Sequence, residues 1–125
     1  MSDKSDYKYI GNEGEELASS FLEDKGYRII GRNYHTRRGE VDIISLSDKY
    51  IVFTEVKYRK NSTSGLADEA VSLRKMERIC KCAQYYLYTH PEYSDYQVRF
   101  DVIAINKKKI LHYENAFEFV IPNSY

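Results

Sequence analysis

The sequence predicts an α/β domain in which two helices cover the two faces of one mixed β-sheet. Apolar residues recur at helical spacing in two separate stretches of the chain. The stretches between and after them are rich in β-branched and aromatic residues, as strands are. Some of these strands are apolar on both faces, so both faces of the sheet need cover. At 125 residues and 42% hydrophobic composition, the chain has the size of one domain.

The first helix is expected to begin at Gly11 and to stop before Gly26, a residue typical of helix C-termini. Residues 1–9 carry no periodic pattern, so we expect a flexible N-terminal tail there and a single domain over residues 10–125. The apolar stripe of this helix consists of Leu17, Ala18, Phe21 and Leu22.

Three strands should follow the first helix. Residues Tyr27 to Tyr34 form the first, and residues 39–46 and 50–58 flank Ser47-Asp48-Lys49 as a β-hairpin. After a polar loop at residues 60–65, the helical pattern from Leu66 to about Thr89 ends before Pro91.

The last part of the chain predicts two more strands. Residues 97–105 form a nearly continuous apolar strand, and residues 106–109 form a turn. Residues 110–113 then begin another strand, and residues 116–125 end in a short edge strand.

Composition limits the classes of function. Nineteen basic residues balance nineteen acidic ones, so any attraction to nucleic acid or to an anionic surface must be local. The sequence contains no apolar run of the roughly 20 residues that cross a bilayer and no signal-peptide core, which favours a cytoplasmic protein without membrane contact. Cys80 and Cys82 point in different directions around a helix, so we expect reduced thiols.

The open end of the hairpin concentrates charge. If Asp48 and Lys49 are the two central turn residues, Asp42 lies opposite Glu55 and Glu40 lies opposite Lys57, all on one face. The other face would carry the apolar side chains of Val41, Ile43, Val52 and Val56. Opposed carboxylates destabilise a sheet unless positive charge intervenes. A salt bridge between Lys57 and Glu40, with solvated carboxylates, is the simpler alternative, but we favour a functional cluster.

This cluster suits a hard metal ion. Mg²⁺ takes oxygen ligands, typically one or two carboxylates together with water and a substrate phosphate. A cation held by Asp42 and Glu55 would activate a bound water, and Lys57 would position that water or stabilise the developing negative charge. The pattern therefore indicates phosphodiester hydrolysis.

Other residues support this interpretation less strongly. Glu15 borders the apolar stripe of the first helix and would either point towards the metal or, as a first-turn carboxylate, complement the helix dipole. A basic stripe with Tyr85 beside it runs along the long helix, ending at Lys81. Candidate phosphate-binding residues are Arg32, Arg37, Arg38, Arg59, Lys60, Arg74 and Arg78. Asp101 is expected to pair with Arg99 or to support the site indirectly.

Five short motifs make the chain resemble a known family, the YraN-type bacterial proteins. They are G-x-x-G-E-x-x-A (11–18), R-N-Y (32–34), G-E-V-D (39–42), E-V-K (55–57) and R-F-D-V-I (99–103). That family is similar to archaeal Holliday-junction resolvases and, by resemblance, to the restriction-endonuclease-like PD-(D/E)XK superfamily.

The resemblance implies an αβββαβ core with a mixed sheet flanked by helices. It also implies that Asp42, Glu55 and Lys57 are the D and E-x-K elements and that Glu15 is a further catalytic carboxylate and metal ligand. The leading hypothesis is thus a Mg²⁺- or Mn²⁺-dependent DNA endonuclease, a homodimer acting on branched DNA in repair or recombination. The alternatives are a non-catalytic nucleic-acid-binding module of a DNA-processing complex and a structural partner-binding domain.

Overall fold

The computed structural model describes residues 2–59, 72–106 and 109–119, without the side chains of residues 2–12 and Arg59. The elements follow the predicted order and confirm the α/β class. They are α1 (Ser2–Asp24), β1 (Arg28–Thr36), β2 (Gly39–Ser47), β3 (Tyr50–Arg59), α2 (Leu73–Thr89), the 3₁₀ helix η2 (Pro91–Tyr93), β4 (Gln97–Asn106) and β5 (Lys109–Phe117).

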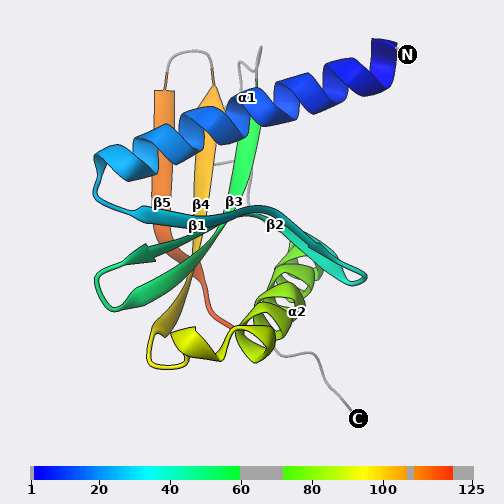
Figure 1. The fold of residues 1–125 in the computed structure, drawn as a ribbon. Helices are drawn as coiled ribbons and strands as arrows, with labels where there is room; N and C mark the ends of the chain where they lie inside the picture. The colour runs from blue at the N-terminus through cyan, green and yellow to red at the C-terminus, as the bar shows by residue number, and fades with distance from the viewer. Residues whose placement is uncertain (1, 60–71, 107–108, 120–125) are drawn as a thin grey trace.

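The strands form one mixed sheet in the order β1-β2-β3-β4-β5. Only the β3–β4 pair is parallel among these strands, and α2 lies in the connection between them, as a parallel crossover requires. Figure 1 shows α1 lying across the sheet and α2 beside β2. The hydrophobic core consists of two clusters, one on each face of the sheet. Consecutive strand residues point to opposite faces, so Ile43 packs on the α1 side and Ile44 on the α2 side.

The predicted hairpin register is confirmed up to the pair Ile43 and Thr54, where the β2–β3 pairing ends. Ser47 pairs with Tyr50, so Asp48 and Lys49 are the central turn residues, and Asp48 has a φ of 54°.

The predicted facing of Val41 is wrong, because Val41 packs in the α2-side cluster with Ile44 and not with Ile43. The regular alternation of β2 is lost where Asn33 of the neighbouring strand adopts left-handed backbone with a φ of 53°.

Both helices begin at positions other than those predicted. Helix α1 starts at Ser2 and not at Gly11, so the predicted tail forms its first turns; residues 2–10 contain neither glycine nor proline to interrupt a helix. Helix α2 starts at Leu73 and not at Leu66, because Ser72 has extended backbone and caps the helix by accepting a hydrogen bond from the N–H of Lys75.

Parts of four predicted elements lie outside the described residues. They are the loop at 60–65, helix residues 66–71, turn residues 107–108 and the final residues 120–125. The predicted residues Ala116 and Phe117 do end a strand, β5.

Two further expectations can be compared with the structure. Cys80 and Cys82 are buried and form no disulfide. No helix in the described part of the chain is long and apolar enough to cross a membrane.

A buried polar network joins β4 and β5 at Asp101, which has no exposed surface. Arg99 donates to both of its carboxylate oxygens, at 2.9 and 2.8 Å, which confirms the predicted pairing. His112 Nε2 lies 2.7 Å away and the N–H of Asn115 donates at 3.0 Å. Burial alone would raise the pKa of Asp101, but these hydrogen bonds outweigh it and lower the pKa below the ordinary 3.8.

We expect Asp101→Ala to lower the free energy of unfolding by about 3–5 kcal/mol, since it leaves the guanidinium of Arg99 buried without its partner. Urea unfolding at pH 7 measures this loss, and the exposed Glu118→Ala serves as the control. Because the native pKa of Asp101 is lowered, its contribution is complete above the unfolded pKa of about 3.8 and is lost as the pH falls through the native pKa. A loss that does not shrink at acidic pH would contradict this assignment.

Candidate functional site

The candidate site lies where β2 and β3 stop pairing. Asp42 immediately precedes Ile43, the last residue of β2 that pairs with β3. Its Oδ2 accepts a hydrogen bond of 2.7 Å from the N–H of Val56. Glu55, beside Val56 on β3, is only 5% exposed. The two predicted carboxylates are therefore both held at the open end of the hairpin.

The charge of Asp42 is disfavoured in this environment. Burial is the main cause that raises its pKa to about 7, and the negative charge of Glu55 is the second. The hydrogen bond from Val56 opposes the shift, while the more weakly acting Glu15 and Glu40 add to it. A carboxylate whose ionised form is disfavoured in this way is stabilised by a nearby positive charge.

Helix α2 supplies a positive charge that the sequence analysis missed. Lys75 Nζ lies 2.6 Å from Oε2 of Glu55. Burial alone would lower the pKa of Lys75, but the hydrogen bond and charge of Glu55 outweigh burial, and Asp42 adds to the rise. The nearest signal in the sequence was Arg74, one residue earlier in the basic stripe of the helix.

Helix α1 brings Glu15 to the same region from the other face of the sheet. Glu15 is 8% exposed, and Asn33 Nδ2 donates to its Oε1 at 2.6 Å. Burial is the main cause that raises the pKa of Glu15. Because α1 begins at Ser2, Glu15 lies well beyond the first turn, which rules out the helix-dipole alternative. Asn33 is a second contact that the sequence analysis missed.

Gly14 allows the close approach that places Glu15. A Cβ atom on Gly14 would lie 2.9 Å from Cβ of Tyr58 on β3, which is closer than real side-chain carbons come. The absence of a side chain therefore lets α1 pack directly against β3.

Lys57 follows Glu55 by two residues on β3, so period-two alternation puts both on one face, and its side chain is half-buried. The sequence analysis offered a salt bridge between Glu40 and Lys57 as an alternative, but Glu40 pairs with His35 instead. His35 Nδ1 lies 3.2 Å from Oε1 of Glu40, and the two side chains are exposed on paired positions of β1 and β2.

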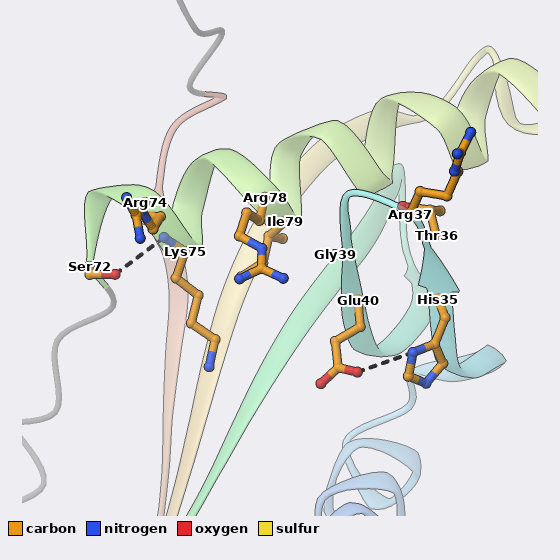
Figure 2. Close-up of a pocket in the computed structure, with 10 residues that line it drawn as sticks. All are labelled: His35, Thr36, Arg37, Gly39, Glu40, Ser72, Arg74, Lys75, Arg78 and Ile79. Carbon is orange, nitrogen blue, oxygen red and sulfur yellow. Dashed lines mark hydrogen bonds and ion pairs between the residues drawn. The ribbon is translucent and has the colours of Figure 1, made fainter.

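A pocket of about 450 Å³ adjoins this site between the β1–β2 turn and the start of α2. Figure 2 shows Lys75 and Arg78 extending from α2 into the space between the helix and Glu40. Gly39 lies against the helix, where a Cβ atom would be 3.2 Å from the backbone oxygen of Arg78. Arg78 Nε donates in turn to the backbone oxygen of Arg38, so the turn is fixed to the helix.

The predicted basic residues divide into two groups. Arg37, Arg74 and Arg78 line the pocket, and the backbone of Arg38 contacts Arg78. Arg32 lies instead beside α1, where its guanidinium nitrogens are 3.9 Å from Glu15 and 3.3 Å from Glu16. The side chain of Arg59 and all of Lys60 lie outside the described residues.

The donor groups can be compared with the needs of a metal ion. Among the described residues, no three or more His, Cys, Asp or Glu side chains are grouped to hold one, so Glu15 as a third ligand stays a prediction. Asp42 and Glu55 still offer two carboxylates, and Mg²⁺ commonly takes only one or two from a protein. The raised pKa of Asp42 shows that added positive charge is favoured there. The donors therefore fit Mg²⁺ or Mn²⁺ and not a closed nitrogen and sulfur site.

The family model and the individual relatives that match this chain all point to the same protein family. Residues 14–105 match the model of the uncharacterised protein family UPF0102. A UPF0102 protein of Thermodesulfovibrio yellowstonii is 45% identical over 108 residues, covering 86% of this chain and 95% of that protein. UPF0102 proteins of Alkaliphilus oremlandii and Lachnoclostridium phytofermentans are 45% and 40% identical, covering 88% and 89% of this chain and 98% and 94% of their own lengths.

We expect the side-chain carboxyl of Asp42 to titrate with a midpoint near pH 7 in the metal-free protein. Carbon-13 NMR of aspartate-labelled protein measures it. In Glu55→Gln the midpoint should fall, because the neighbouring negative charge is removed. The exposed Asp48 of the hairpin turn provides the reference signal in the same spectra.

The same shift predicts the direction of a stability change. Because the native pKa of Asp42 lies above its unfolded value, the native state holds the extra proton between about pH 4 and 7, and stability falls as the pH rises through that window. Asp42→Asn should remove this component in unfolding measurements. A wild-type midpoint near 4 would contradict the raised pKa of Asp42, and a midpoint unchanged in Glu55→Gln would show that the charge of Glu55 does not contribute to it.

Proposed function

Because the chain belongs to the family UPF0102, whose description names no activity, we propose from the site geometry that it is a metal-dependent nuclease hydrolysing phosphodiester bonds in DNA. One observation carries the proposal. The part-buried carboxylate of Asp42 and the buried carboxylate of Glu55 lie on neighbouring strands, and the charge of Glu55 helps to raise the pKa of Asp42, with the ammonium of Lys75 against Glu55. This arrangement suits a divalent cation and a bound phosphate.

Each residue has a distinct role in the proposal. Asp42 and Glu55 hold Mg²⁺ or Mn²⁺, with Glu15 contributing negative charge from α1. The bound cation supplies an activated water and neutralises charge on the phosphate. Lys57 stabilises the negative charge that develops during attack, and Lys75 exchanges Glu55 for a phosphate oxygen when substrate arrives.

Nucleic acid is the substrate class that the neighbouring pocket favours. Arg37, Arg74 and Arg78 line it, and phosphate contacts by such side chains supply most sequence-independent affinity for DNA. The resemblance to Holliday-junction resolvases, within the PD-(D/E)XK superfamily, extends the proposal to branched DNA, to a homodimer and to a cytoplasmic role in repair or recombination.

Calorimetric titration with Mn²⁺ tests the metal site apart from any activity. Wild-type protein should bind, and Asp42→Asn should weaken binding at least about tenfold because one of two carboxylate ligands is lost. Affinity should rise with pH through about 7, since the cation and the proton compete for Asp42. Asp48→Asn makes the same chemical change at the exposed turn of the same hairpin and should bind as wild type does.

Cleavage of labelled four-way junctions, flaps and single strands tests the activity. It should require added Mg²⁺ or Mn²⁺ and should fall at least about 100-fold in Asp42→Asn and in Lys57→Ala, since each removes a group that stabilises the transition state. Asp48→Asn should cut normally. Cleavage that survives chelation or both site substitutions would refute the proposal, and salt-sensitive binding without cleavage would identify a non-catalytic nucleic-acid-binding module.

A further inference from the structure

One face of α2 carries a continuous stripe of cations and aromatic rings. Arg74, Arg78, Lys81, Tyr85 and Tyr88 are spaced by four, three, four and three residues, which keeps them on one side of a helix. The opposite side is the one that packs on the sheet, through residues such as Ile79 and Ala83. From Arg74 to Tyr88 the stripe is about 21 Å long, at about 1.5 Å per residue.

The aromatic end of the stripe is exposed. Tyr85 is 54% exposed and Tyr88 is 82% exposed. Together with Arg37, Arg38, Lys81 and Gln84 they line a hollow of about 400 Å³. Large rings left in water beside cations and an amide group indicate a surface that another molecule covers.

The hollow lies next to the pocket that adjoins the candidate site. Arg37 lines both, and Figure 2 shows it directed away from Lys75, alongside the later turns of α2. At the other end of the pocket, Lys75 forms an ion pair with Glu55. One surface therefore leads from the exposed tyrosines, past cations, to the candidate site.

We propose that this surface binds an unpaired nucleic-acid strand, with bases stacked on Tyr85 and Tyr88 and phosphates held by the arginines and Lys81. Unpaired bases stack on aromatic side chains, whereas the bases of a duplex have their faces covered by neighbours. At about 3.4 Å per nucleotide, the stripe accommodates about six stacked nucleotides. The inference rests on the proposed function and adds the kind of DNA that the site receives: a strand with a single-stranded segment next to the cleaved bond.

Fluorescence anisotropy with a labelled 12-nucleotide oligothymidylate and a duplex of the same length, both in EDTA, tests the platform without cleavage. The double variant Tyr85→Ala/Tyr88→Ala should bind the single strand about 10- to 100-fold more weakly, because two stacking contacts are lost, and the duplex less than about twofold more weakly. Tyr85→Phe/Tyr88→Phe should keep single-strand affinity, since the rings remain.

Tyr113→Ala, which removes a 38% exposed ring from β5, is the matched control and should bind both DNAs as wild type does. Circular dichroism and thermal unfolding check that the variants are folded. Unchanged single-strand affinity in the double alanine variant, an equal loss for single strand and duplex, or an equal loss in the Tyr113 variant would each overturn the platform.

Together with the cleavage assay described above, the binding assay separates the platform from the nuclease. Single-strand binding that depends on the two tyrosines, in a protein that cuts no DNA, would support the platform and reject the nuclease. Metal-dependent cleavage by a protein whose single-strand affinity does not depend on these tyrosines would support the nuclease and reject the platform. No binding of the oligothymidylate at about 50 mM salt would overturn the platform, because phosphate contacts are strong at low salt.

Discussion

The repulsion between the carboxylates of Asp42 and Glu55 is the constraint on which the rest of this site depends. Two like charges on neighbouring strands are unfavourable at short range, and burial removes the water that would screen them. Two elements offset this repulsion: β3 donates the N–H of Val56 to Asp42, and α2 brings the ammonium of Lys75 to Glu55. Helix α1, which approaches through Gly14, adds the negative charge of Glu15, and Asn33 holds that side chain. The sheet core supports the arrangement by fixing both helices, one on each face.

How far local pattern decides structure can be seen in the hairpin. A two-residue turn leaves one register, so the pairing from Ser47 and Tyr50 to Ile43 and Thr54 follows from Asp48 and Lys49. Asp42 and Glu55 lie one residue beyond that pairing. Helix ends are harder to predict, because they depend on the backbone of single residues: Ser72 is extended and begins α2 late, while nothing stops α1 from starting at Ser2. The alternation predicted along β2 failed at Val41, beside the stretch of β1 in which Asn33 has left-handed backbone.

The candidate site shows the same division. Asp42, Glu55 and Glu15 could be predicted from spacing and resemblance, because they belong to short motifs within single elements. Lys75 and Asn33 act across elements, and their contacts depend on how far α2 and β1 lie from the carboxylates. No periodicity within one helix or strand encodes that distance. The predicted basic residues also divide by packing, because Arg32 lies beside α1 while Arg78 lines the pocket.

The stripe on α2 has a consequence for the molecule as a whole, since the chain carries no net charge. Cations gathered on one side must be balanced by acids elsewhere, and the exposed side of α1 carries Glu13, Glu16, Glu23 and Asp24. A polyanion therefore meets exposed carboxylates on α1 and exposed cations on the stripe of α2, which favours its approach to α2. A neutral protein of this kind gains orientation on approach without the indiscriminate attraction that a large positive charge would give.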